Sequence, residues 1–346
     1  MDGGQTSQIL EAAGADGLLS SLPGEFTMGD GIPDANAVLQ TVNGERVLSR
    51  LWESALAGST GAFRLTGRLC GVLVLFAVWT RYRKAVHGGG DLFSRAVTLV
   101  LSLIGFGALT DLFADTADYF SQLHTAVTAA LTTLTALSAM RGAVQTAALG
   151  SMGMALFLAV METVCASVLF PFLRLCAGMS LVSAVGDTDT PAQISGLLRR
   201  QFLWIVGGVM TLLCAVLSYQ SVLARAADSV AMRAVKFTLS GAVPIIGGAV
   251  GEAAAAVAAG FSLAQKTVGV LGIAAILWQI LPTVCSVALV RGAFSVSAMA
   301  AALLGMKTEE GVLSECASLC GFLLAVCIAA AVFYILMLTL CMNGGG

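Results

Sequence analysis

The residues best placed to do chemistry lie between Met232 and Ala253, in the sequence MRAVKFTLSGAVPIIGGAVGEA. This stretch carries two cations, a carboxylate, a proline and several glycines inside a very apolar chain. Within a bilayer, charges and unpaired backbone groups are costly unless protein or water satisfies them. We therefore expect either a break in a membrane helix or an element at the membrane interface.

The second half of this stretch combines a helix-bending residue with closely spaced glycines. Pro244 removes a backbone donor and bends a helix. Gly247 and Gly251 form a GxxxG pattern that lets helices approach closely, Gly248 lies between them, and Glu252 ends the run. The functional interpretation is a kinked, close-packed element that faces a protein partner or a pore. The alternative is ordinary helix packing with a tolerated kink.

A second intramembrane carboxylate is Glu162, which lies in the long apolar segment Met152–Val185. Arg174 follows Pro171 in the same segment, so the two charges could pair across a bend. An ionisable side chain inside the membrane suggests a functional site. The alternative is a buried, paired or protonated carboxylate that only helps the helices to pack.

Enzyme signatures are missing from the sequence. It contains no HExxH, no GxSxG and no Walker A loop, and only two histidines, His87 and His124. The nine cysteines lie mostly in apolar segments without a CxxC pair, which favours a role in helix packing over metal binding. The sequence therefore predicts a protein that is not an enzyme and that needs no cofactor or metal.

The composition is that of an all-α, polytopic membrane protein. Of the 346 residues, 58% are hydrophobic and only 11% are charged, against about 25% charged residues in soluble domains. The mean hydropathy is +0.90. The lipid bilayer is thus a predicted partner, whereas no basic run indicates nucleic-acid binding.

The sequence divides into a polar, acidic region at 1–60 and a multispanning helical domain at 61–346. About 20 apolar residues are needed to cross a bilayer, and the domain offers seven to eight candidate segments, including the Pro/Gly-broken or re-entrant one. They are Leu65–Thr80, Leu92–Phe113, Leu123–Met140, Met152–Val185, Phe202–Leu223, Phe237–Ala264, Thr267–Val290 and Ala317–Leu340. The cluster Asp111, Asp115 and Asp118 is expected to separate the second segment from the third.

The distribution of cations predicts an orientation. Arg81, Arg83 and Lys84 place the end of the first segment in the cytoplasm, so the acidic N-terminal region is expected outside. If Arg199-Arg200 is also cytoplasmic, Met152–Val185 must cross twice or form a re-entrant hairpin bent at Pro171. The direction of the segments after residue 150 stays open.

The stretch from Arg233 to Ala253 resembles the signature of the stage III sporulation protein AE family of endospore-forming bacteria. The family pattern reads R-x-x-K-F-x-x-S-x-x-aliphatic-P-I-x-G-G-x-x-x-E-A. The residues of this chain that match it in register are Arg233, Lys236, Phe237, Ser240, Val243, Pro244, Ile245, Gly247, Gly248, Glu252 and Ala253. Gly241-Ala242 departs from the more usual Asn-aromatic pair.

This resemblance implies a non-enzymatic component of a channel-like complex between mother cell and forespore, required for late sporulation. The protein would lie in the mother-cell membrane around the forespore, with its N-terminus extracytoplasmic. Its partners would be the other proteins of the same operon and a forespore membrane protein. From the residues alone, a stand-alone permease for a small solute stays open as the alternative, using the broken helix around Pro244–Glu252.

Overall fold

The computed structural model describes residues 44–86, 91–140, 143–186, 190–242 and 247–343, and these ranges are almost entirely helical. The elements are α4 (Gly44–Val86), α5 (Asp91–Met140), α6 (Val144–Glu162), η2 (Thr163–Leu169), α7 (Phe170–Gly186), α8 (Thr190–Ala242), α9 (Gly247–Leu303) and α10 (Lys307–Asn343). No strand occurs in the described ranges, in agreement with the predicted all-α fold.

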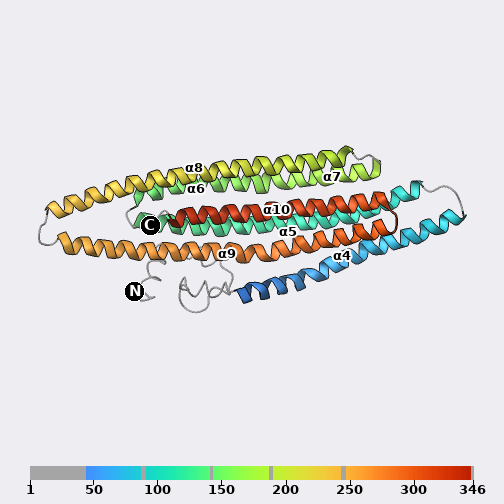
Figure 1. Cartoon of the computed structure of the whole chain (residues 1–346), viewed down its shortest axis with the longest axis horizontal. Helices are drawn as coiled ribbons and strands as arrows, with labels where there is room; N and C mark the ends of the chain where they lie inside the picture. Colours follow the sequence, from blue (N-terminus) through green and yellow to red (C-terminus); the bar gives the residue numbers. More distant parts are fainter. Residues whose placement is uncertain (1–43, 87–90, 141–142, 187–189, 243–246, 344–346) are drawn as a thin grey trace.

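The helices form a long antiparallel bundle, with the chain direction reversing from each helical run to the next (Figure 1). α9 packs along α10, α4 and α5, while α8 packs on α6 and α7. The elements α6, η2 and α7 follow one another along a single line beside α8 (Figure 1). This arrangement puts the start of α4 and the end of α10 on the same side of the predicted membrane.

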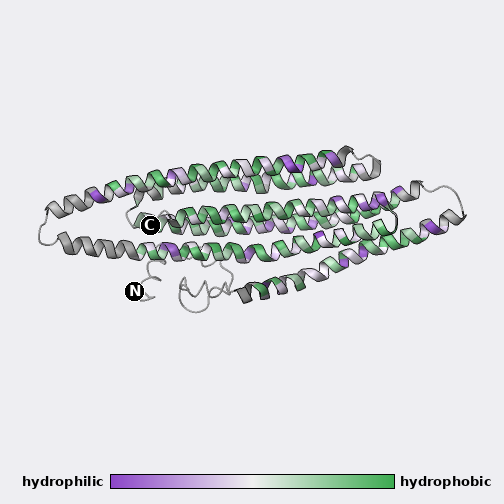
Figure 2. Ribbon diagram, viewed as in Figure 1, coloured by the Kyte–Doolittle hydropathy of each residue, from purple (hydrophilic) through white to green (hydrophobic). Residues whose placement is uncertain are grey.

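Within the described residues, 6 helical runs are long and apolar enough to cross a membrane, which is close to the predicted seven to eight. Hydrophobic residues cover most of α10 and the middle of α8 and α9 (Figure 2). The prediction of a polytopic helical membrane protein is confirmed. The helices are longer than one crossing requires, because α9 has 57 residues, about 85 Å at 1.5 Å per residue, against about 20 residues for one crossing.

One continuous helix replaces the second and third predicted segments. α5 runs without a break from Asp91 to Met140 and passes through the aspartate cluster that was expected to separate them. Asp111, Asp115 and Asp118 are spaced by four and three residues, so they share one helical face, and all three are exposed. This part of the chain therefore crosses the bundle once and not twice. Every later segment then runs in the direction opposite to the one that two crossings would give.

The segment around Pro171 is also continuous, so the predicted double crossing or re-entrant hairpin is wrong. Helical structure extends without interruption from Val144 to Gly186. A proline ring clashes with the carbonyl four residues earlier, here Ser167, and supplies no N–H. Ser167 lies in the π-helix η2, whose wider turns take up this clash without a sharp bend.

The core consists mainly of apolar side chains, and several hydroxyl groups within it bond to their own helix. Six of the nine cysteines are buried and all nine are free thiols, namely Cys70, Cys165, Cys176, Cys214, Cys285, Cys316, Cys320, Cys327 and Cys341. Thr116 Oγ1 donates to the Leu112 carbonyl at 2.7 Å, and Ser138 Oγ donates to the Leu134 carbonyl at 2.9 Å. Such bonds satisfy polar atoms where no water is present.

Most of the predicted polar N-terminal region lies outside the described residues. Its last part, from Gly44 onward, is the beginning of α4, which continues past residue 60 to Val86. The division expected at residue 60 thus falls within one helix, and the extracytoplasmic location of this region stays a prediction.

Candidate functional site

The signature stretch covers the end of α8 and the start of α9, two helices that run antiparallel to each other (Figure 1). Arg233, Lys236 and Phe237 are in the last three turns of α8, which ends at Ala242. Gly247, Gly248, Gly251 and Glu252 are in the first two turns of α9, which begins at Gly247. Pro244 falls between these helices, at 243–246, and lies outside the described residues. The described part of α8 thus ends before Pro244, and that of α9 begins after it.

The last turns of α8 and the first turns of α9 project beyond the rest of the bundle (Figure 1). Gln265 of α9 marks the level where α5 and α10 end, because its Nε2 donates to Ser138 Oγ at 3.2 Å and to the Cys341 carbonyl at 3.0 Å. α9 begins at Gly247, so about 27 Å of helix extends past this level. We call residues 228–242 and 247–264 the projecting hairpin.

This position favours one of the two placements that the sequence allowed. The signature lies past the level where α5 and α10 end, and an uncharged stretch of α9, 253–265, separates Glu252 from Lys266. Arg233 is exposed, as expected for a cation outside hydrocarbon. The interfacial placement is therefore favoured over a break within the membrane, and it stays a prediction.

Backbone position alone indicates what the projecting hairpin can do. Gly247 and Gly251 lie about one turn apart on α9, a GxxxG spacing that lets another helix approach closely. Glu252, in the second turn, lies near the positive end of the helix dipole. The role of these residues as a contact surface stays a prediction.

A buried ion pair fastens α8 to α10 at the other end of the bundle. Arg199 Nη2 donates to Glu315 Oε2 at 2.6 Å, and Arg199 Nη1 donates to Ser318 Oγ at 2.9 Å. The Arg199 side chain is only 7% exposed. The sequence reasoning missed this pair because Arg199 and Glu315 are 116 positions apart, and no local pattern links them.

A neighbouring polar contact joins α5 to α10. Thr98 Oγ1 donates to Glu309 Oε1 at 2.9 Å, and Glu309 is 3% exposed. Together with the Arg199–Glu315 pair, it holds the beginning of α10 to the helices on both of its sides. Both contacts lie where the charged part of α10 meets its apolar part. They therefore fix how far α10 extends along the bundle axis as well as its position between its neighbours.

The structure does not form the Glu162–Arg174 pair that the sequence left open. The two residues lie 12 positions apart in one continuous helical run, roughly 18 Å along its axis. Glu162 Oε2 instead lies 3.9 Å from His124 Nε2 of α5, and the Glu162 side chain is 64% exposed. Arg174 is exposed on α7. Because the carboxylate is mostly exposed, these residues form a loose helix-to-helix contact.

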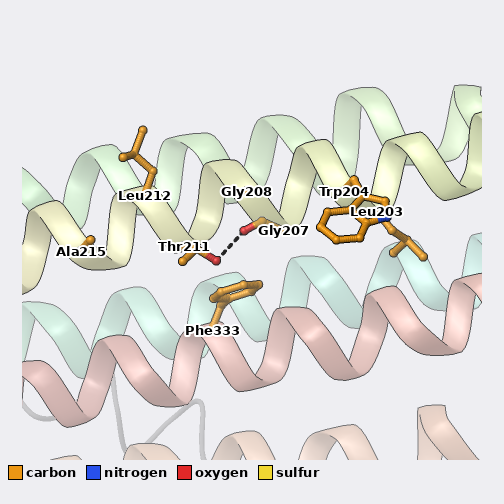
Figure 3. Close-up of a pocket in the computed structure, with 8 residues that line it drawn as sticks. All are labelled: Leu203, Trp204, Gly207, Gly208, Thr211, Leu212, Ala215 and Phe333. Carbon is orange, nitrogen blue, oxygen red and sulfur yellow. Dashed lines mark hydrogen bonds between the residues drawn. The ribbon is translucent and has the colours of Figure 1, made fainter.

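A shallow apolar hollow lies between α8 and α10 (Figure 3). Figure 3 shows the residues that line it, with Thr211 Oγ1 donating to the Gly207 carbonyl at 2.7 Å. The hollow has a volume of about 660 Å³, and its lining comprises Leu203, Trp204, Gly207, Gly208, Thr211, Leu212, Ala215 and Phe333. None of these side chains is ionisable, so the hollow presents a surface suited to lipid or to another apolar helix.

The fold defines a multi-pass helical membrane protein with a hairpin that projects beyond its apolar bundle. The chain belongs to the stage III sporulation protein AE family, whose model matches residues 40–345. This range includes the signature stretch, so the sequence-based resemblance is confirmed.

One curated relative shows the same affiliation. "Stage III sporulation protein AE" of Bacillus subtilis (strain 168) is 28% identical over 108 residues, which is 31% of this chain and 27% of that protein. The matched region thus spans about a quarter of the relative's length. No solved structure matches the chain.

Proposed function

We propose that this protein is a non-enzymatic membrane component of a channel-like complex between mother cell and forespore, required for late sporulation. The observation that carries the proposal is membership of the stage III sporulation protein AE family over residues 40–345. The proposed location is the mother-cell membrane around the forespore. The proposed partners are the other proteins of the same operon and a protein of the forespore membrane.

The distribution of charge supports an orientation in which the projecting hairpin faces away from the mother-cell cytoplasm. Cations gather where α4 ends, α5 and α8 begin, and α10 begins; they are Arg81, Arg83, Lys84, Arg95, Arg199, Arg200 and Lys307. By the positive-inside rule these cations favour a cytoplasmic location for this end, whereas Arg225, Arg233, Lys236 and Lys266 near the other end oppose it. The hairpin, the start of α4 and the end of α10 then lie on the outer side, where a forespore protein could reach them.

Deletion of the gene tests the proposal directly. The deletion strain should complete engulfment and then stop, and the full-length gene supplied in trans should restore spore formation. A normal spore yield without the gene would overturn the proposal. A second experiment addresses the permease alternative by reconstituting the purified protein alone in liposomes. Solute flux that Glu252→Gln abolishes would favour a stand-alone permease over a component that works only with its partners.

A further inference from the structure

The uncovered face of α5 is polar over a length that matches the apolar part of the bundle. Between Phe106 and Met140, no large hydrophobic side chain of α5 is exposed. The exposed residues there are all polar or small, namely Gly107, Asp111, Ala114, Asp115, Asp118, Ser121, Gln122, Thr125, Thr132 and Ala139. We call this set the polar face of α5. Several members recur at three- and four-residue spacing, so they form one stripe along the helix.

Contacts with α10 fix the depth of this stripe. A side chain at Gly105 would meet Cys316 Sγ at 3.4 Å, and Ser138 shares the Gln265 amide with the carbonyl of Cys341. The polar face of α5 therefore lies beside Cys316–Cys341, a stretch without a charged residue. That stretch exceeds the about 20 residues needed to cross hydrocarbon.

The exposed face of α8 at the same depth has the opposite character. It carries Leu203, Trp204, Ile205, Val209, Leu212 and Val216, which are all exposed large apolar side chains. α8 thus has the surface expected of a helix that faces lipid. The polar face of α5 cannot be explained in the same way. Thr125 and Thr132 donate to carbonyls of their own helix, but the carboxylates of Asp111, Asp115 and Asp118 would be unsolvated charges in contact with lipid chains.

One end of the polar face opens into a charged groove between α4 and α5. The groove has a volume of about 660 Å³, with Arg64 and Arg68 on the α4 wall and Asp111 and Asp115 on the α5 wall. All four residues are exposed, and among the described side chains no ion pair within 4.0 Å joins them. Opposite charges that share a groove without forming ion pairs indicate that water fills the groove.

We propose that the polar face of α5 lines a water-filled path through the membrane that admits small hydrated solutes, with the Arg64/Arg68 groove as its mouth. The remaining walls are supplied by other subunits of the complex, and in this respect the inference rests on the proposed function. Asp118 lies deeper in the path than the groove, about 16 Å along α5 from Gly107. There, the path favours cations over anions because its fixed charge is negative.

Two cysteine substitutions at matched depth test this path. Ser121→Cys lies on the polar face of α5, and Leu212→Cys lies on the apolar face of α8, where Leu212 is 67% exposed. Sealed membrane vesicles from sporulating cells are treated with a quaternary-ammonium thiosulfonate, which does not cross lipid. Modification is read by mass spectrometry of the peptide that contains the new thiol, so the native cysteines do not interfere.

We expect modification of Ser121→Cys and none of Leu212→Cys. The cationic reagent should also react at least about threefold faster than a sulfonate-bearing analogue, after correction for their rates with a free thiol, and Asp118→Asn should remove this preference. Failure of Ser121→Cys to react, or equal reaction at both positions, would overturn the path.

Spore formation by the Ser121→Cys strain separates the two ideas. If this strain sporulates but its thiol does not react, the water-filled path falls while the proposed function stands. If the gene deletion has no effect on sporulation, the proposed function falls whatever the labelling shows.

Discussion

Arg199 of α8 and Glu315 of α10 form an ion pair with a nitrogen-to-oxygen distance of 2.6 Å, at the end of the bundle that we propose to be cytoplasmic. The pair is asymmetric, because Arg199 is 7% exposed whereas Glu315 is 29% exposed. A buried guanidinium without its counter-ion is costly, so the two side chains depend on each other. The pair therefore fixes the depth of α8 relative to α10.

Removal of the carboxylate should destabilise the bundle. We expect Glu315→Ala to lower the free energy of unfolding by about 2–3 kcal/mol, since it leaves Arg199 buried and without its partner. Thermal unfolding in detergent, followed by circular dichroism, measures the change. Replacing both residues, as Arg199→Leu with Glu315→Leu, should recover most of the loss.

The exposed neighbour Arg200 provides the control for this experiment. Arg200→Ala removes a cation from the helical turn that holds Arg199 but breaks no described ion pair, so its unfolding midpoint should match that of the wild type. If Arg200→Ala were as destabilising as Glu315→Ala, the effect would come from the charge of the segment and not from the pair.

The sequence was sufficient for the fold class and the family but not for the number of crossings. Asp111, Asp115 and Asp118 look like a loop when they are counted as charges, yet their spacing places them on one exposed face of α5. Whether a helix can continue through such a cluster depends on what lies beside that face. This is a tertiary property that hydropathy along the chain does not contain.

The sequence could not predict the contacts between distant segments, for a related reason. Arg199 and Glu315 meet only because α8 and α10 pack at a particular axial offset. Pro171 was expected to bend the chain, whereas the π-helix before it absorbs the strain. The signature from Arg233 to Ala253 was recognisable in the sequence because it is a local pattern. Its position on the projecting hairpin required the lengths of α8 and α9.

Gln265 connects three helices where the projecting hairpin leaves the bundle. Its Nε2 reaches Ser138 of α5 and the Cys341 carbonyl of α10, and the residue is 2% exposed. We expect Gln265→Leu to cost about 1 kcal/mol, because two hydrogen bonds are lost but Oε1 has no hydrogen-bond partner in the described structure. Hydrogen exchange should increase at the ends of α5 and α10. Lys266→Leu, at an exposed neighbouring position, should leave the exchange unchanged.

Gly272 lies at a close approach of three helices. A Cβ atom there would lie 3.1 Å from Leu338 Cδ1 and 3.3 Å from Ala130 Cβ. Gly272→Val should therefore overpack the junction of α9, α10 and α5 and destabilise the protein by about 1–3 kcal/mol. Gly292→Val is the matched control on the same helix, because nothing lies within 4 Å of its Cβ position. Equal thermal stability of the two variants would contradict this account of the packing.

The projecting hairpin yields a prediction about assembly. If Gly247 and Gly251 form a helix contact with a partner, Gly247→Leu should block close approach and reduce recovery of the complex. Helix contacts of this kind contribute only about 1–2 kcal/mol each, so we expect a roughly tenfold loss of co-purified partners rather than complete loss. The amount of inserted protein should not change, because Gly247 lies beyond the apolar part of α9.

Gly292→Leu is the control for the assembly experiment. Gly292 is an exposed glycine on the same helix, but it lies near the other end of α9, far from the projecting hairpin. Its substitution should leave both insertion and co-purification of the operon-encoded partners at wild-type levels. Wild-type recovery of partners with Gly247→Leu would show that this face of the hairpin is not the contact surface. The signature would then have to act through the other residues that the family pattern marks, Arg233 and Lys236 first among them, because both belong to the projecting hairpin.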